Sequence, residues 1–352
     1  MLLAGCATKP IAPPQPAPTD TPAIPVVAEA YIAPGEAGDE LDSLAPWPTE
    51  DGDTWVVATA KNTHRLIVFD GDTGELLRSI GSRGTAPGAF TRPNGVAIHG
   101  DLLFVSERDN RRVQVLRFPD LSPVAMIGEG ELRSPYGVWV YEDAPGELIA
   151  YVTDSFQEGA RFDIVPPLDQ LDQRVRRYRL RTGNDQRVEV ESLGSFGDTS
   201  EADALRIVES IAGDPVFDRL LVADEDMRHG QTVHEYTLDG RYTGRKLPAG
   251  TFDAEPEGIA LWACTADSGY WVFADQLYPL TIFRLFDRQT LAARGAFTGK
   301  VTAWTDGIAL HAAGTARFPH GALFAMHDDK AMTAFDLRDI AEALQLAPAC
   351  RD

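Results

Sequence analysis

An internal repeat is the sequence feature that most constrains the fold. Beyond about residue 40, a polar residue followed by a short apolar run recurs, and two further runs of β-forming residues follow it each time. The clearest copies open at Asn94, Tyr136, Glu209, Glu257 and Asp306, at intervals of 42, 73, 48 and 49 residues. Three of these intervals are typical of a four-stranded blade of about 40–50 residues, and the interval of 73 indicates an insertion in the third copy, at roughly residues 156–174. With a less regular copy that opens the domain, the pattern predicts an all-β fold, a six-bladed β-propeller.

The repeat also predicts where polar side chains gather. In a propeller, the first strand of each blade lines the central channel and the second runs back beside it, so the start of one meets the end of the other. Polar residues occupy both places although the strands themselves are apolar. Before the first strands stand Asn94, Tyr136, Glu209, Glu257 and Asp306; after the second strands stand Lys61, Arg108, Asp224, Glu225, Asp226 and Gln276. We expect all of them at one mouth of the channel.

These residues are sorted along the chain by chemistry. The early copies supply Lys61, Asn94, Arg108 and Tyr136, which are hydrogen-bond donors suited to an oxyanion. The later copies supply the carboxylates Glu209, Asp224, Glu225, Asp226, Glu257 and Asp306. Gathered carboxylates repel one another unless they are solvated or neutralised, and calcium, with about 6–8 oxygen ligands, is a natural partner. The alternative is that polar residues at strand ends only satisfy turns or form a solvated acidic loop.

Charge and residue patterns exclude several classes of function. A formal net charge of −21 and a pI near 4.7 argue against nucleic acid or anionic lipid as a partner, since both require a basic face. The seven histidines show no paired spacing of the kind a zinc site requires. Ser155 and Ser210 lack the context of a nucleophile elbow, which argues against a serine hydrolase.

The N-terminal segment reads as an anchor and a spacer. Leu3-Ala4-Gly5-Cys6 resembles a bacterial lipobox, so residues 1–6 are expected to be the end of a lipoprotein signal with Cys6 as the acylated residue. Residues 7–38 are rich in Pro and Ala and are expected to form a disordered linker ahead of a propeller at 39–352. We therefore expect a protein of the bacterial cell envelope (outer membrane or periplasm), attached to a membrane only through Cys6, or a secreted protein.

The two remaining cysteines leave one question open. Cys264 and Cys350 would face an oxidising compartment, in which a disulfide is allowed. Sequence alone does not show whether two cysteines lie close enough to pair.

At this point the pattern resembles the β-propeller phytases, calcium-dependent phosphatases that act on inositol hexakisphosphate. Short motifs carry the resemblance and follow the family's order over most of residues 42–346. They are Pro93-Asn94-Gly-Val, Ser106-Glu-Arg108, Tyr136-Gly-Val, Val208-Glu209-Ser-Ile-Ala, Ala223-Asp-Glu-Asp226, Pro256-Glu257-Gly-Ile, Thr305-Asp306-Gly-Ile and Phe318-Pro319-His-Gly-Ala-Leu.

The resemblance implies roles for individual residues. It places Glu209, Glu225, Asp226, Glu257 and Asp306 at calcium-binding positions, Lys61, Arg108 and Tyr136 at phosphate-contacting positions, and Gln276 at a polar position near the site. The implied activity is that of a monomeric, calcium-dependent phosphomonoester hydrolase resembling 3-phytase. It would release phosphate from myo-inositol hexakisphosphate or a related small-molecule phosphate ester, by attack of water bound to the metal.

Some positions depart from the family pattern and keep other functions open. Lys61-Asn62 replaces a lysine pair, Asp42-Ser43 an acidic pair, and Trp304 an acidic residue; Gly95 follows Asn94 where a second Asn is usual. One alternative is a non-catalytic, ligand-binding propeller tethered at the cell surface, because the second copy also resembles an NHL repeat. Another is a gluconolactonase-type lactonase, which uses the same fold and one divalent metal.

Overall fold

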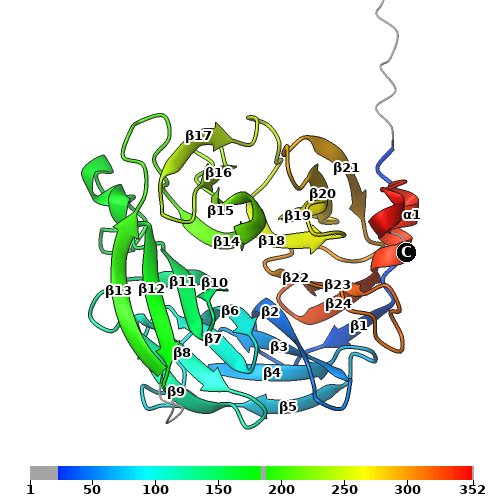
Figure 1. Ribbon diagram of the computed structural model, residues 1–352, viewed down its shortest axis with the longest axis horizontal. Coiled ribbons are helices and arrows are strands. Elements are labelled where there is room, and N and C mark those ends of the chain that lie inside the picture. Colours follow the sequence, from blue (N-terminus) through cyan, green and yellow to red (C-terminus); the bar gives the residue numbers. More distant parts are fainter. Residues whose placement is uncertain (1–22, 184–187, 351–352) are drawn as a thin grey trace, which may run out of the picture.

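Six antiparallel sheets of four strands surround a central axis, and each copy of the repeat supplies the strands of one sheet, except that the last sheet takes its outermost strand from the N-terminal segment (Figure 1). The computed structural model describes residues 23–183 and 188–350, and all of these sheets lie within those ranges. The predicted all-β, six-bladed β-propeller is therefore confirmed. The innermost strands line a channel with a volume of about 270 Å³. Within the described ranges, no helix is long and apolar enough to cross a membrane.

The strands follow the chain from blade to blade. The first two blades consist of β2 (Leu41–Pro48), β3 (Thr54–Ala60), β4 (Arg65–Asp70) and β5 (Leu76–Ile80), then β6 (Pro93–His99), β7 (Leu102–Glu107), β8 (Arg112–Arg117) and β9 (Ser122–Ile127). The third and fourth consist of β10 (Pro135–Ala144), β11 (Glu147–Asp154), β12 (Val175–Thr182) and β13 (Val188–Phe196), then β14 (Val208–Asp214), β15 (Arg219–Asp224), β16 (Thr232–Tyr236) and β17 (Tyr242–Lys246). The fifth consists of β18 (Pro256–Ala263), β19 (Gly269–Asp275), β20 (Ile282–Asp287) and β21 (Ala293–Thr298).

The sixth blade joins the two ends of the chain. It is built from β22 (Ile308–His311), β23 (Ala322–His327) and β24 (Ala331–Asp336), and its outermost strand is β1 (Tyr31–Pro34). Tyr31 pairs with Ala334, and Pro34 with Ala331. Without β1, the outer edge of β24 would leave backbone groups unpaired. The expectation that the spacer extends to residue 38 is thus wrong for its last part, because this non-local pairing orders it; residues 7–22 and Cys6 lie outside the described residues.

The core lies between neighbouring blades. Second strands such as β7 are buried along their whole length, since side chains on both of their faces meet an adjacent sheet. For example, Val57 and Leu66 of the first blade pack with Leu103 and Val105 of the second. Burial of this kind recurs at the other blade junctions and holds the ring of strand ends in place.

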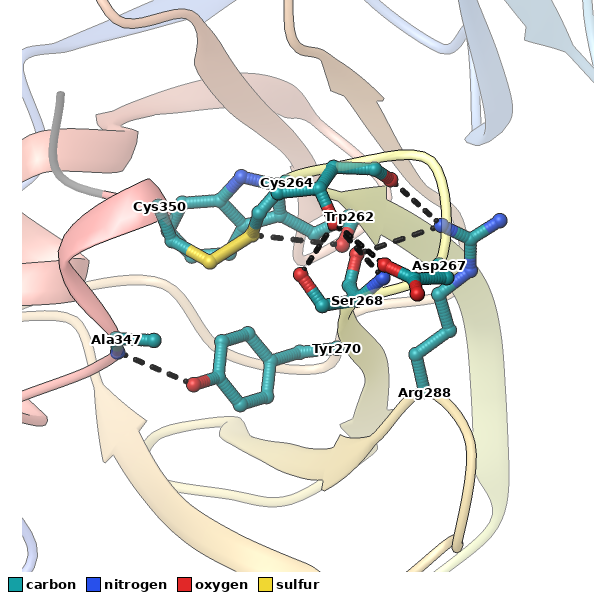
Figure 2. Close-up of a disulfide and its surroundings, with 9 residues drawn as sticks. Trp262, Cys264, Asp267, Ser268, Tyr270, Arg288, Ala347 and Cys350 are labelled. Carbon is teal, nitrogen blue, oxygen red and sulfur yellow. Dashed lines mark hydrogen bonds between the residues drawn. A yellow bond between two sulfur atoms is a disulfide. The ribbon is translucent and has the colours of Figure 1, made fainter.

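A disulfide attaches the C-terminal segment to the fifth blade. Cys264, in the turn after β18, is bonded to Cys350, which follows helix α1 (Leu337–Ala343) in the short η3 (Pro348–Cys350) (Figure 2). Nearby, the backbone N–H of Ala347 donates to the hydroxyl of Tyr270 at 3.2 Å. The two short helices η1 (Leu168–Gln173) and η2 (Pro215–Phe217) lie elsewhere, in connections of the third and fourth blades. The pairing that sequence left open is thus present.

We expect removal of this disulfide to destabilise the fold. The bond closes a loop whose ends are 86 residues apart, which limits the freedom of the unfolded chain. A Cys264→Ser/Cys350→Ser double variant should lose about 2–4 kcal/mol in free energy of unfolding. Denaturant titration measures the loss, and dithiothreitol should reproduce it in the natural protein while leaving the double variant unchanged. Equal stability of the two proteins would contradict the expectation.

Candidate metal centre

The side chains at one mouth of the channel stand on β-bulges. The strands β2, β6, β10, β14 and β18 each show a register shift at the end nearest this mouth. Asp42, Asn94, Tyr136, Glu209 and Glu257 lie at these shifts. A bulge inserts one extra residue and redirects the side chain beside it. The repeated bulge therefore turns one polar side chain from each of five blades toward the axis.

A glycine after the site residue allows the blades to approach one another. A Cβ atom on Gly95 would lie 2.2 Å from the carbonyl oxygen of Tyr136, and one on Gly137 would lie 2.2 Å from that of Glu209. No side chain fits at such distances. The Thr153 hydroxyl also donates to the Glu209 carbonyl at 2.8 Å, which ties the third blade to the fourth. The glycine in the repeat thus reflects close backbone packing around the channel.

Three glutamates from two neighbouring blades form a cluster that can hold a metal ion. One carboxylate oxygen from each of Glu209, Glu225 and Glu257 lies within 4.8 Å of the others. Glu225 and Glu257 are only 6% and 9% exposed, and Glu209 is partly exposed. Burial, followed by repulsion from neighbouring carboxylates, raises the pKa of all three well above its ordinary value. Such a cluster is stable at neutral pH only when a proton or a cation neutralises it.

The donor set of this glutamate triad fits a hard divalent cation. Its ligand atoms are all carboxylate oxygens, which suit calcium, magnesium or manganese better than softer metals. The Oε1 atom of Glu225 is buried and has no hydrogen-bond partner among the described residues. An unpaired buried oxygen is costly, and a bound cation would satisfy it. The glutamate triad could therefore bind a metal ion, and its residues do not determine which ion that is.

Asp306 is not part of the triad, because its carboxylate forms an ion pair with Lys61. The Lys61 ammonium lies 3.0 Å from Asp306 Oδ2, 2.9 Å from Asp42 Oδ2 and 3.7 Å from Glu40 Oε1. The other oxygen of Asp306 accepts a hydrogen bond from Gln276. Burial alone would lower the pKa of Lys61, but Asp42 and Asp306 raise it above its usual value, so the ammonium stays charged. Lys61 and Gln276 thus lie at the mouth of the channel, but they contact carboxylates there.

Asp224 and Asp226 also lie outside the triad. Asp224 accepts hydrogen bonds from the backbone N–H groups of Arg206 at 2.9 Å and Ile207 at 3.0 Å, which fasten the segment that leads into β14. Asp226 accepts from the side chains of Arg228 and His229. Because successive side chains in an extended segment point to opposite sides, only the middle carboxylate of this run, Glu225, reaches the channel.

Arg108 and Tyr136 lie on the other side of Glu209. These three residues line a pocket of about 720 Å³, whose remaining lining comes largely from the segment between β11 and η1. Arg108 donates to Asp109 at 2.8 Å. Burial, followed by the charge of Glu209, raises the pKa of Tyr136 well above its usual value, so its hydroxyl remains a donor. Glu209 thus lies both in the triad and beside Arg108 and Tyr136.

Two parts of the site go beyond the sequence prediction. Asp42 is not among the residues predicted for the site, yet it is one of the partners of Lys61, and its Oδ2 accepts from Asn94 Nδ2 at 3.4 Å. Its place at the start of a first strand, matching that of Asn94, is the signal that could have identified it. Asn94 Oδ1 is itself buried without a partner among the described residues. The second part, the wall of the pocket made by residues 156–162, has no signal in the repeat because it belongs to an insertion.

The raised pKa values of the triad predict how stability depends on pH. A carboxyl group with a raised pKa in the folded state stabilises the fold below its unfolded pKa, and this contribution is lost as the pH rises through the folded value. Without metal, the triad should therefore lower stability as the pH rises above about 4.5, the ordinary pKa of a glutamate. Calcium opposes the loss, so the increase in Tm on adding calcium should grow over this range, because protons and the cation compete for the same oxygens.

Differential scanning fluorimetry with calcium and with EGTA at each pH measures this effect. Burial lowers the pKa of His234 to about 4, so this residue changes stability with pH in the opposite direction. Its contribution is the same with calcium and with EGTA, so it cancels in the difference between the two Tm values. A calcium-induced increase that shrinks as the pH rises would contradict the prediction.

Comparisons with known proteins give the fold and no family. No protein-family model and no curated protein matches this chain. Among solved structures, the chain is similar to the luciferin-regenerating enzyme, with 12% identity, a TM-score of 0.53, and 89% of this chain and 96% of that chain covered. It is also similar to hydrazine synthase of Kuenenia stuttgartiensis, with 11% identity, a TM-score of 0.51, and 89% and 81% covered. At these identities the likeness concerns the propeller fold alone.

Proposed function

We propose that this protein is a calcium-dependent phosphatase that hydrolyses phosphomonoesters at the mouth of the channel. The observation that carries the proposal is that Glu209 belongs both to the glutamate triad and to the pocket lined by Arg108 and Tyr136. A cation-binding cluster and groups that bind an oxyanion therefore adjoin, which is the requirement for holding a phosphate. The resemblance of the repeat motifs to β-propeller phytases supports the same activity.

In this proposal, different residues bind the cation and the phosphate. When bound to the triad, a divalent cation supplies positive charge beside the phosphate and lowers the pKa of a coordinated water. Arg108 binds phosphate oxygens through its planar array of donors. The Tyr136 hydroxyl, which stays protonated, donates a further hydrogen bond. Lys61 adds a fixed positive charge, held in place by Asp42 and Asp306.

Phosphate release in the presence and absence of calcium tests the proposal. Purified protein loaded with calcium should release inorganic phosphate from myo-inositol hexakisphosphate or from phenyl phosphate, and EGTA should abolish the release. The proposal fails if neither ester is hydrolysed by a sample whose Tm rises with calcium. That outcome would favour the ligand-binding propeller, since the cation would then stabilise the fold without turnover.

We also propose that the protein works in the cell envelope. The disulfide between Cys264 and Cys350 supports an oxidising compartment, and the lipobox-like sequence before Cys6 supports a lipid anchor. Fractionation of cells that express the natural sequence or a Cys6→Ser variant tests the anchor. The natural protein should be found with membranes and the variant should be released; equal distribution would contradict the anchor.

A further inference from the structure

The pocket beside the glutamate triad is larger than a phosphate group needs, and its lining includes two phenylalanines. Its volume of about 720 Å³ lies in the range of whole-ligand sites, about 300–1,000 Å³. Arg108, Tyr136 and Glu209 line the side nearest the triad, and Phe156 and Phe162 line the side formed by the insertion. The pocket therefore has an anion-binding end and an aromatic end.

The floor of the aromatic end is rigidly built. Phe156 is buried, and the guanidinium of Arg133 lies over its ring, 3.0 Å from the centroid. Arg174, which is fully buried, donates to the carbonyl oxygens of Phe156 at 2.7 Å, Asp154 at 3.0 Å and Arg206 at 2.6 Å. A buried arginine whose bonds all go to backbone carbonyls fixes the path of the chain. The insertion is thus attached firmly to the blade beside Glu209.

A short hairpin in the insertion carries the other aromatic ring. Glu158 and Ile164 exchange two backbone hydrogen bonds, of 2.7 and 3.2 Å, and the N–H of Phe162 donates to the carbonyl of Gly159 at 3.2 Å. Phe162 has a φ of +52°, which is strained for a residue with a large side chain. The residue is 72% exposed although it lines the pocket. The hairpin therefore holds a large apolar ring at the rim of the pocket, where water covers it unless a ligand does.

We propose that this pocket selects phosphate monoesters whose alcohol carries a planar aromatic group, with Phe162 as a specificity-determining residue. This inference rests on the proposed function and names its substrate class. The phosphate lies at the Arg108 end and the aromatic group lies between the ring of Phe162 and the Arg133–Phe156 pair. Aromatic rings stack on one another and on guanidinium groups, which gives such an alcohol an advantage that a small aliphatic alcohol lacks.

Binding of two phosphonates that are not hydrolysed tests the inference directly. Phenylphosphonate and methylphosphonate carry the same anion and differ in the ring, so calorimetry with calcium-loaded protein isolates the aromatic end. The natural protein should bind phenylphosphonate about tenfold more tightly than methylphosphonate. Phe162→Ala should remove most of this preference, and Phe162→Tyr should keep it. The control is Ile32→Ala, which removes an exposed apolar side chain from β1, outside the pocket, and should leave the preference unchanged.

The outcomes separate this inference from the proposed function. A lasting preference for phenylphosphonate without hydrolysis of any ester would refute the phosphatase and support the aromatic subsite. Hydrolysis with equal affinity for the two phosphonates would support the phosphatase and overturn the subsite. The subsite is also overturned if Phe162→Ala keeps the full preference. Since Phe162 is exposed, its replacement leaves the core of the blade intact, and an unchanged Tm checks that the variant is folded.

Discussion

The Glu225→Gln variant should lose both the response to calcium and phosphate release. Glu225 contributes a buried oxygen that has no hydrogen-bond partner among the described residues, and its carboxylate lies in the triad with Glu209 and Glu257. Changes beside a metal site reduce affinity or activity by about 10–100-fold, so loss of a direct ligand should reduce phosphate release by more than about 100-fold. The calcium-induced increase in Tm should disappear as well.

The same variant should be more stable than the natural protein when metal is absent. Replacing one of three clustered carboxylates relieves the repulsion that, together with burial, raises the pKa values of Glu209 and Glu257. The gain at about pH 8 should be about 1 kcal/mol or more, the equivalent of one pKa unit. Loss of activity together with higher stability in EGTA would identify Glu225 as a metal ligand, because replacing a residue that only supports the fold would lower stability.

Asp226→Asn is the matched control, because Asp226 directly follows Glu225 but bonds to Arg228 and His229. It should keep the calcium-induced increase in Tm. Thermal unfolding with calcium and with EGTA, together with a phosphate assay, measures all three proteins. Loss of the calcium response in Asp226→Asn, with Glu225→Gln unaffected, would show that the cation lies elsewhere.

Removing the charge of Lys61 should have the second large effect. The Lys61 ammonium lies between Asp42 and Asp306, so Lys61→Met leaves two largely buried carboxylates facing each other without a cation. Breaking a buried pair in this way costs about 3–5 kcal/mol in free energy of unfolding. Phosphate release should fall too, because the fixed positive charge at the mouth is lost.

Calcium should partly restore the stability of Lys61→Met by entering the vacated place. We expect the natural protein to bind a single calcium ion at the triad, and the variant to bind a second between Asp42 and Asp306. Calorimetric stoichiometry measures this difference. The control is Lys330→Met, since Lys330 is exposed and pairs with Asp328 at the surface, where an ion pair contributes little. If Lys61→Met in EGTA is as stable as the natural protein, the lysine does not neutralise these carboxylates.

Several elements of the site follow from local sequence rules. The polar residue that opens each first strand lies at the mouth because antiparallel strands bring the start of one beside the end of the next. Glu209 and Glu225 could be placed together on this basis, and Glu257 joined them through the repeat. It could also be predicted that only one carboxylate of residues 224–226 faces the channel, because successive side chains of an extended segment point to opposite sides.

Other elements needed the blades to be placed relative to one another. The sequence predicts Asp306 as a metal ligand, but in the structure its carboxylate pairs with Lys61, which is far away in sequence and lies on the neighbouring first blade. The pairing of β1 with β24 and the bond between Cys264 and Cys350 likewise join segments from distant parts of the chain. The wall formed by Phe156 and Phe162 depends on the path of an insertion that no other copy of the repeat contains.

The sequence by itself determined the six-bladed ring and the mouth at which its polar residues meet, because strand periodicity and antiparallel pairing act between near neighbours in the chain. Only the tertiary structure decided which carboxylates share a cation and which hold a lysine. That choice depends on separations of a few ångströms between side chains of different blades, which bulges and packing set and no local pattern records.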